Sequence, residues 1–330
     1  MEHDFHCWLK KRTLNHVHRD RVQVGMGDDG AVLAPSNLSI VVVTDTIAEG
    51  THFDLSQHDL SLVGRKALAV NLSDLAAMGA QPSSAVLTFM LPRNWTSLNF
   101  PHQSNPEILD ADSTTTHAGS TGLIAAKQIY QGINKIAEEF DVAIIGGDTN
   151  TWNGPLVVGA TVMGYREPTQ TGWSIGGVQP GDKIVVSGSF GGSIHGRHLS
   201  FTPRVKLANY LVEHYAIGAA TDASDSLSLD LATLASSSNV GINLDLHAIP
   251  ISSDVRASEH PAALHHALTD GEDFELILAV CPAQIDRLMA DNNLPCKLTV
   301  IGTATETHRE LRTLDHHGKI STFTPKGYIH

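Results

Sequence analysis

Acidic residues recur at the ends of apolar strands and inside apolar helices of this sequence. Asp45 follows the apolar run in VVVTDTI, Asp74 lies inside NLSDLAAMG, and Asp148 closes IIGGDT. Asp222 and Asp225 stand close together in TDASDSLSLDL, a segment without Lys or Arg. Burying an unpaired carboxylate is costly. Divalent cations account for all of these residues together, because oxygen ligands bind Mg²⁺ and phosphate oxygens complete its shell. The pattern therefore predicts a site that holds a nucleoside triphosphate through metal ions.

Residues 25–30, GMGDDG, match the glycine spacing of a dinucleotide-binding turn. That turn needs a preceding strand and a long helix opening inside it, whereas Pro35 stops any helix here early. Ionised Asp28 and Asp29 would also repel a phosphate, by about 4 kcal/mol for unit charges about 4 Å apart at an effective dielectric near 20. We therefore reject a dinucleotide site. Two interpretations stay open: a tight turn whose aspartates cap backbone N–H groups, and a turn whose aspartates bind a metal ion that binds a phosphate.

Composition bounds the class of protein. The chain has 330 residues, of which 42% are apolar and 17% charged, as expected for a packed enzyme. Its net charge of −13 argues against nucleic-acid and anionic-membrane partners. The absence of a GxxxxGK[ST] loop and of the protein-kinase motifs means that any phosphoryl transfer would be metal-bridged on a less common fold. The three cysteines have no metal spacing, and no signal or spanning segment is found, so we expect a cytoplasmic protein.

Helix and strand signals alternate along the chain without strict β-α-β regularity, which predicts an α/β (α+β) fold with mixed sheets. In the first half we expect a buried helix at 59–79 and an amphipathic helix at 122–140, a loop or insertion at 94–121, and strands at 38–47, 83–92, 141–149 and 156–165, with the third strand running into a glycine turn. In the second half we expect strands at 183–189, 242–246, 274–280 and 297–305, with helices from about Pro203, at 226–238 and near 282–292. The Gly- and Pro-rich stretch 166–182 predicts two domains, 1–168 and 169–330.

The sequence resembles the thiamine-monophosphate kinases, a family of the aminoimidazole-ribonucleotide-synthetase-like superfamily. The matching stretches, between about residue 25 and residue 328, are GMGDDGAVL, VVTDTIAEGTHF, RKALAVNLSDLAAMGAQP, IIGGDT, PGDKIVVSG, TDASDSLSLDL, GEDFELIL and KGY. The resemblance implies an N-terminal domain that dimerises through its sheet, a C-terminal domain, and an ATP site in the cleft between them. It also implies transfer of the ATP γ-phosphate to thiamine monophosphate, with Mg²⁺ as cofactor.

The resemblance assigns roles to individual residues. By position, the metal-binding set comprises Asp29, Thr44, Asp45, Asp74, Asp148, Asp222 and Asp225. Gly147, Asp148 and Ser224 resemble nucleotide contacts, and His52 and Glu272 resemble contacts to the acceptor. No general base is implied, since the acceptor phosphate is already largely ionised near neutral pH.

Several matched positions depart from the pattern of the family. Ser226 and Asp270 stand where the family usually has glycine, Ile175 stands where a basic residue that contacts ATP is expected, and Pro325 stands where an aromatic residue is expected. The metal-binding half is therefore intact, whereas the acceptor half is altered. Two other classes consequently stay open: another ATP-dependent enzyme of the superfamily, and a degenerate nucleotide-binding protein with a regulatory role.

Single residues also allow structural interpretations. His52 fits a capped strand end as well as an acceptor contact, and the GED sequence around Glu272 is also typical of a tight turn. Tyr130 lies on the apolar face of a helix and fits a core position better than a ligand contact. Arg204 fits either a phosphate contact or an ion pair with a carboxylate.

Overall fold

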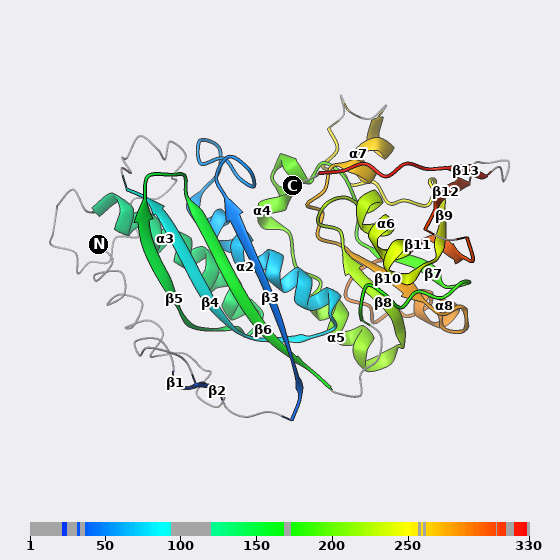
Figure 1. Cartoon of the computed structure of the whole chain (residues 1–330), viewed down its shortest axis with the longest axis horizontal. Helices are drawn as coiled ribbons and strands as arrows, with labels where there is room; N and C mark the ends of the chain where they lie inside the picture. Colours follow the sequence, from blue (N-terminus) through cyan, green and yellow to red (C-terminus); the bar gives the residue numbers. More distant parts are fainter. Residues whose placement is uncertain are drawn as a thin grey trace. The chain divides into compact units, whose positions relative to one another are not determined.

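The computed structural model divides the chain into two compact units, each described by itself below (Figure 1). One unit holds the described residues up to Asn71 together with Pro82–Tyr165, and the other holds Leu72–Gln81 and the described residues from Arg166 onward. The structure describes residues 22–24, 32–33, 37–93, 120–167, 173–256, 259, 262–307, 309–314 and 320–328. Asp29, the rest of GMGDDG and residues 94–119 lie outside this set.

The first unit is built on a four-stranded sheet whose order is β3-β6-β4-β5. The strands are β3 (Ser39–Ala48), β4 (Gln81–Pro92), β5 (Ala143–Trp152) and β6 (Val157–Arg166), and β4 and β5 run parallel. Helices α2 (Leu60–Ala77) and α3 (Ser120–Glu139) lie behind this sheet in Figure 1. The strands β1 (Val22–Val24) and β2 (Val32–Leu33) form a separate antiparallel pair.

Helix α2 is apolar nearly all round, as its sequence predicts, and it is buried. Its polar residues Lys66, Asn71 and Ser73 are buried as well. Gly64 lets α2 approach α3 closely, because a Cβ at this position would lie 1.9 Å from the carbonyl oxygen of Ile129. The close helix pair covers one face of the sheet.

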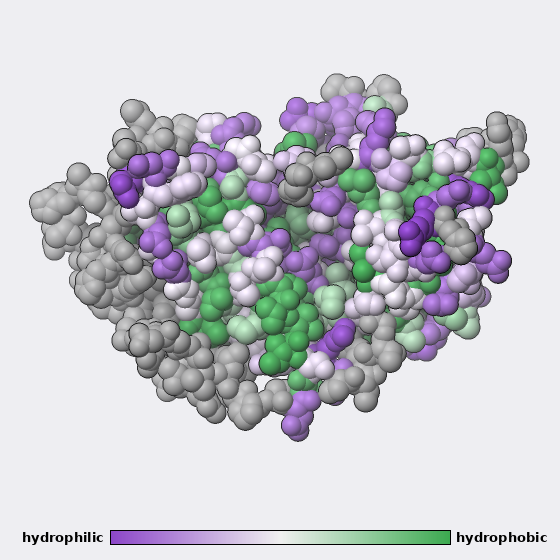
Figure 2. All heavy atoms as spheres, in the orientation of Figure 1, coloured by the Kyte–Doolittle hydropathy of each residue, from purple (hydrophilic) through white to green (hydrophobic). Residues whose placement is uncertain are grey.

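The opposite face of the sheet carries exposed apolar side chains. Along β3, Val41 and Ile47 are buried, whereas Ile40 is 61% and Val42 59% exposed. This alternation follows from the two-residue period of a strand. Figure 2, drawn from the same side, shows hydrophobic residues on this face.

The second unit is built on a seven-stranded sheet whose order is β13-β12-β9-β11-β7-β10-β8. Neighbouring strands run antiparallel except β9 and β12, which run parallel. The strands are β7 (Lys183–Ser187), β8 (Ile217–Asp222), β9 (Gly241–Asp245), β10 (Leu276–Val280), β11 (Leu298–Thr305), β12 (Leu311–Leu314) and β13 (Ile320–Thr322). The prediction of mixed sheets is thereby confirmed.

Short helices surround this sheet, and α6 contributes most to its core. Leu227, Leu231 and Leu234 of α6 pack with Ile184 of β7 and Ile277 of β10. The helices are η2 (Ser193–His195), α4 (Arg197–Ser200), α5 (Val205–His214), α6 (Leu227–Ser238), α7 (Ala263–Thr269) and α8 (Pro282–Met289). Within the described residues, no helix combines the length and hydropathy that a membrane span requires.

The structure corrects the sequence prediction at β5. The predicted glycine turn after 141–149 does not form, and β5 continues through Gly146 and Gly147 to Trp152. The local register shift lies between Ala85 and Val86 of β4, where β5 passes from Ile144 to Gly146. A bulge of this kind bends a strand without ending it, so the glycines mark an irregularity rather than a turn. Strands β8, β12 and β13 and helix α7 were not expected from the sequence.

Candidate functional site

In the first unit, β3 carries neighbouring candidate residues on opposite faces of the sheet. The exposed hydroxyl of Thr44 lies 2.9 Å from that of Thr161 on β6 and donates to the Ala160 carbonyl oxygen at 3.2 Å. Asp45 alternates with Thr44 and therefore shares the helix-covered face with Val41 and Ile47.

Asp148 is exposed on the other edge strand, β5, where it lies opposite Thr88 of β4. A Cβ built on Gly159 of β6 would lie 3.7 Å from the Cβ of Thr88 and 3.2 Å from the hydroxyl of Thr46, so these positions form one row across the sheet. Asp148 consequently shares the open face with Thr44 and Thr46, whereas Asp45 points to the other face. The Asp148 carboxylate accepts a hydrogen bond from the Asn150 side-chain amide at 2.7 Å.

Gly147 precedes Asp148 at a point where β5 leaves no room for a side chain. A Cβ at Gly147 would lie 2.1 Å from the carbonyl oxygen of Leu87. Any other residue would push β5 away from β4 and would move Asp148 with it. Gly147 is thus required for β5 to lie this close to β4, independently of any contact with a ligand.

His52 lies in the turn after β3 in a fixed orientation. Its Nδ1 accepts a hydrogen bond from the Ala48 N–H at 3.1 Å, so the neutral ring carries its proton on Nε2. The buried ammonium of Lys66 donates to the His52 carbonyl oxygen at 2.8 Å. The structure therefore shows His52 as part of a capped turn, with Nε2 as its remaining donor nitrogen.

In the second unit, candidate residues gather where β8 ends and α6 begins. Asp222 is the last residue of β8, and its carboxylate accepts a hydrogen bond from the Ser73 hydroxyl of α2 at 2.5 Å. Ser226 caps α6 by accepting from the Leu229 N–H at 3.1 Å. The buried Asp230 in the first turn accepts from the N–H groups of Asp225 and Ser226. These contacts fix the backbone of residues 224–226 at the positive end of the helix dipole.

Negative charge is crowded at this helix end. Burial, opposed by the hydrogen bond from Ser226 and assisted by the carboxylates of Asp222 and Asp225, raises the pKa of Asp230 to about 8. Such repulsion between carboxylates is what a bound cation relieves.

Glu272 lies beside Ser224 and Asp225. Its N–H donates to the Ser224 carbonyl oxygen at 2.7 Å, and a Cβ on neighbouring Gly271 would lie 2.6 Å from the Asp225 carbonyl oxygen. Its carboxylate is 3.1 Å from Nδ1 of His198. The structure thus brings a predicted nucleotide contact, a predicted metal ligand and a predicted acceptor contact to one place in the second unit.

The segment after Pro325 joins the same place. The Tyr328 N–H donates to the Asp225 carbonyl oxygen at 3.1 Å. The hydroxyls of Ser226 and Ser228 both donate to the Lys326 carbonyl oxygen, at 2.9 and 2.6 Å. Ser226, which replaces the glycine of the family, therefore holds both the helix start and this segment. By contrast, Ile175 lies at the other end of α6, where its carbonyl oxygen accepts from Ser238 at 3.2 Å.

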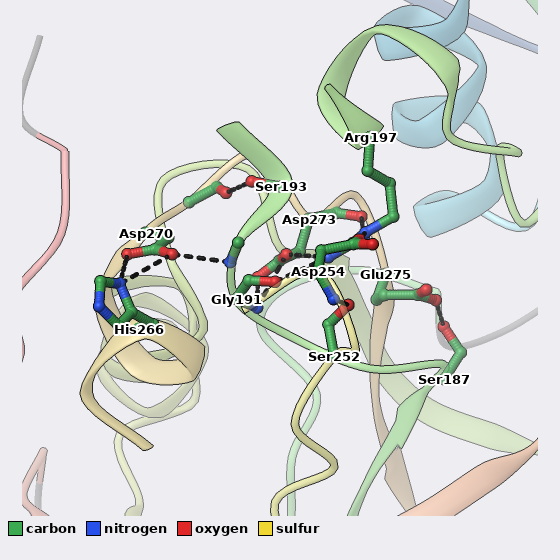
Figure 3. A network of polar contacts seen from close by, with 12 residues as sticks. Ser187, Gly191, Ser193, Arg197, Ser252, Asp254, His266, Asp270, Asp273 and Glu275 are labelled. Carbon is green, nitrogen blue, oxygen red and sulfur yellow. Dashed lines mark hydrogen bonds and ion pairs between the residues drawn. The ribbon is translucent and has the colours of Figure 1, made fainter. Parts of the chain in front are cut away.

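A polar network surrounds the Glu272 turn (Figure 3). Arg197 forms an ion pair with Asp273 at 2.7 Å and a second one with Asp254. Asp270 accepts from the Gly192 N–H at 2.7 Å and contacts Nδ1 of His266 at 2.9 Å. Burial raises the pKa of Asp273 to about 7, although Arg197 lowers it. The network joins the loop after β7 to the turn before β10.

Two residues with open interpretations are settled by their surroundings. Arg204 forms an ion pair with the buried carboxylate of Glu275, to which Ser187 also donates at 2.5 Å, so Arg204 is a structural cation. Tyr130 is buried in the core.

The candidate residues are therefore gathered only in part. Ser224, Asp225 and Glu272 come together, whereas Asp45 and Asp148 face opposite sides of one sheet. Across the described part of the chain, no group of three or more His, Cys, Asp or Glu side chains could hold a metal ion. Sequence reasoning missed Asp230, although it is another acid in an apolar helix, and it missed Lys66, Arg197 and His198, for which no local pattern exists.

Comparisons with known proteins identify the family of this chain. Residues 27–165 match the family model of the AIR synthase related protein, N-terminal domain. A thiamine-monophosphate kinase of Rhodopirellula baltica is 38% identical over 295 residues, covering 86% of this chain and 83% of the relative. The crystal structure of thiamine-monophosphate kinase from Stenotrophomonas maltophilia superposes with a TM-score of 0.74 at 31% identity, covering 92% of this chain and 94% of the other. AaThiL, complexed with AMPPCP and TMP, shares the fold, with a TM-score of 0.69 at 22% identity and coverage of 96% and 93%. This chain belongs to the thiamine-monophosphate kinase family of phosphotransferases.

Proposed function

We propose that this protein transfers the γ-phosphate of ATP to thiamine monophosphate and so makes thiamine diphosphate. The observation that carries the proposal is the convergence of Ser224, Asp225 and Glu272 at the start of α6, in a chain of this family. A helix N-terminus stabilises phosphate, and a carboxylate such as Glu272 suits a cationic or amino-bearing heterocycle.

The proposed reaction needs positioning and charge neutralisation more than a strong base. A phosphate oxygen of the acceptor attacks the γ-phosphorus of ATP, the bond between that phosphorus and the β-bridging oxygen breaks, and ADP leaves with the electron pair. The attacking oxygen needs no proton removed, because the phosphate monoester is already largely ionised near neutral pH. His52 and Glu272 would orient the acceptor, while Gly147, Asp148 and Ser224 would contact the nucleotide.

At the start of α6, Asp222 and Asp225 would supply two of the oxygen ligands of a Mg²⁺ ion. The crowded carboxylates that raise the pKa of Asp230 are the oxygen donors that this cation prefers. When bound, Mg²⁺ would neutralise charge on the transferring phosphoryl group. The proposed ligands are Asp29, Thr44, Asp45, Asp74, Asp148, Asp222 and Asp225.

The proposal assigns nucleotide binding, metal binding and dimerisation to residues 1–168, and completion of the site to residues 169–330. Support for a homodimer comes from the open face of the first sheet, where Ile40 and Val42 are exposed. A second copy on this face would bury them, and stable interfaces of this kind exceed about 2,000 Å².

The test is a coupled assay of the purified protein with ATP, Mg²⁺ and thiamine monophosphate. Production of ADP and thiamine diphosphate in equal amounts, dependent on both Mg²⁺ and the acceptor, supports the proposal. If the protein binds Mg-ATP but phosphorylates no member of a panel of phosphorylated acceptors, a regulatory nucleotide-binding role replaces the kinase. If ADP forms with a different acceptor, the protein is another ATP-dependent enzyme of the superfamily.

A further inference from the structure

The turn that carries Glu272 has an unusual backbone. Glu272 has a φ of +51° and Phe274 also has a φ of +51°, a region that residues other than glycine seldom occupy. Such conformations persist where the surrounding structure determines them, and they concentrate at functional sites. The contacts that hold this turn therefore decide where the Glu272 carboxylate points.

One side chain contacts that carboxylate from a buried position. Nδ1 of His198 lies 3.1 Å from a Glu272 carboxylate oxygen, and the side chains are 4% and 31% exposed. A carboxylate has no hydrogen to donate, so the contact is attractive when Nδ1 of His198 carries the proton. The buried ring has little freedom to move, whereas the part-exposed carboxylate keeps a surface that a ligand could contact.

The backbone beside His198 is tied to the same turn. Arg197 donates to the Asp273 carboxylate at 2.7 Å and to the carbonyl oxygens of Gly191 and Asp273 at 3.3 and 3.4 Å (Figure 3). The Ser193 hydroxyl donates to the Gly271 carbonyl oxygen at 2.6 Å. His198 and Glu272 thus belong to segments that cannot shift independently of one another.

We propose that His198 is a positioning residue that orients Glu272 toward the acceptor and so sets acceptor specificity. The inference rests on the proposed function, in which Glu272 contacts the acceptor. The favoured acceptor class is a phosphate monoester attached to a cationic or amino-bearing heterocycle, which the oriented carboxylate would bind.

The experiment compares substitutions that keep, move or remove the donor. His198→Asn keeps an amide nitrogen two bonds from Cβ, as Nδ1 is, whereas His198→Gln moves it one bond further and His198→Phe removes it. Loss of a polar contact to a charged group corresponds to about a 10- to 100-fold change. We expect His198→Phe and His198→Gln to raise KM for thiamine monophosphate by about that factor, with KM for ATP and kcat within about twofold of wild type. His198→Asn should recover most of the loss.

Two controls separate positioning from general damage. In the Glu272→Gln background, His198→Phe should have no further effect on the acceptor KM, because the oriented group is already changed. His247→Phe, at an exposed position far along the chain, should leave all constants at wild-type values. If His198→Phe does not fold, the difference in acceptor KM between His198→Asn and His198→Gln tests whether the position of the donor matters.

The inference is overturned if the donor-moving and donor-removing variants leave the acceptor KM unchanged, or if they raise both Michaelis constants equally. Additive effects of His198→Phe and Glu272→Gln also overturn it. If these results are obtained while the wild-type protein phosphorylates thiamine monophosphate, only the inference about His198 is overturned and the proposed function is retained. A wild-type protein that phosphorylates no acceptor overturns the proposed function and this inference together.

Discussion

Asp273 should make the stability of this protein fall as pH rises from mildly acidic to neutral. Burial, opposed by Arg197 and assisted by nearby Glu275, raises its pKa from the ordinary value of 3.8 to about 7. Between these two pKa values the unfolded chain has lost the proton that the folded protein retains. The native state therefore binds more protons, and the free energy of unfolding decreases as pH increases.

The size of the effect follows from the two pKa values. The slope is at most about 1.4 kcal/mol per pH unit. Between pH 5 and pH 7 the contribution of Asp273 falls by about 2 kcal/mol, and above pH 8 it no longer changes with pH. The side chain is almost fully buried, so solvent screening reduces this figure little.

The assay is urea denaturation of the wild type and Asp273→Asn at several pH values from 5 to 8.5. The amide oxygen of Asn can still accept from Arg197, while its NH₂ group faces the Gly191 N–H and costs stability equally at all pH values. We expect the stability of the variant relative to wild type to rise by about 2 kcal/mol from pH 5 to pH 7 and then to level off.

Asp291→Asn is the matched control with the opposite sign. Hydrogen bonds from Asn293, Tyr210 and Tyr215 lower the pKa of Asp291 to about 2. Its contribution to stability is thus complete above pH 4 and is lost as pH falls toward 2, so the difference from wild type should be constant from pH 5 to 8.5. A similarly constant difference for Asp273→Asn, or one that falls as pH rises, would refute the reasoning about burial.

Three further predictions concern the proposed function. Asp74→Asn should abolish turnover without lowering the melting temperature, because a metal ligand is lost while carboxylate repulsion is relieved; full activity at ordinary Mg²⁺ would contradict this role. Sedimentation should show a homodimer, and Ile40→Asp with Val42→Asp should convert it to a monomer, since both side chains are exposed on the open sheet face; a monomeric wild type at micromolar concentration would refute the interface. Pro325→Trp should lower KM for the acceptor about 2- to 10-fold through ring stacking; an unchanged constant would show that this position does not line the site.

Much of the fold could be predicted because burial leaves a local signature. The apolar runs of β3, α2 and β10 identify buried elements, and Ser226 before an apolar run identifies the start of α6. The same physics located the candidate acids, since a carboxylate inside an apolar segment needs a reason to be there.

Other features depend on contacts that no local pattern records. Strand β8, IGAATD, is short and rich in small residues, so it carries little hydrophobic signal. Gly147 indicates a turn in the sequence, yet a glycine is needed at this position because the carbonyl oxygen of Leu87 on another strand leaves no room for a side chain. The partners of Arg197, at Asp254 and Asp273, lie 57 and 76 residues away along the chain. Such pairs depend on how loops meet after the sheet has formed.

The departures from the family pattern raise the question of whether the acceptor half has lost its binding function or has changed its geometry. In a site that no longer binds a ligand, substitutions are expected to leave polar groups without hydrogen-bond partners, because selection no longer maintains their contacts. A buried polar group without a partner costs stability. Here Ser226 caps α6 and binds the Lys326 carbonyl oxygen, while Asp270 accepts from the Gly192 N–H and contacts His266. Both substitutions thus add contacts that hold the segments around Glu272. A turn held this firmly suits an acceptor site with altered geometry, which favours a working phosphotransferase over a degenerate nucleotide-binding protein.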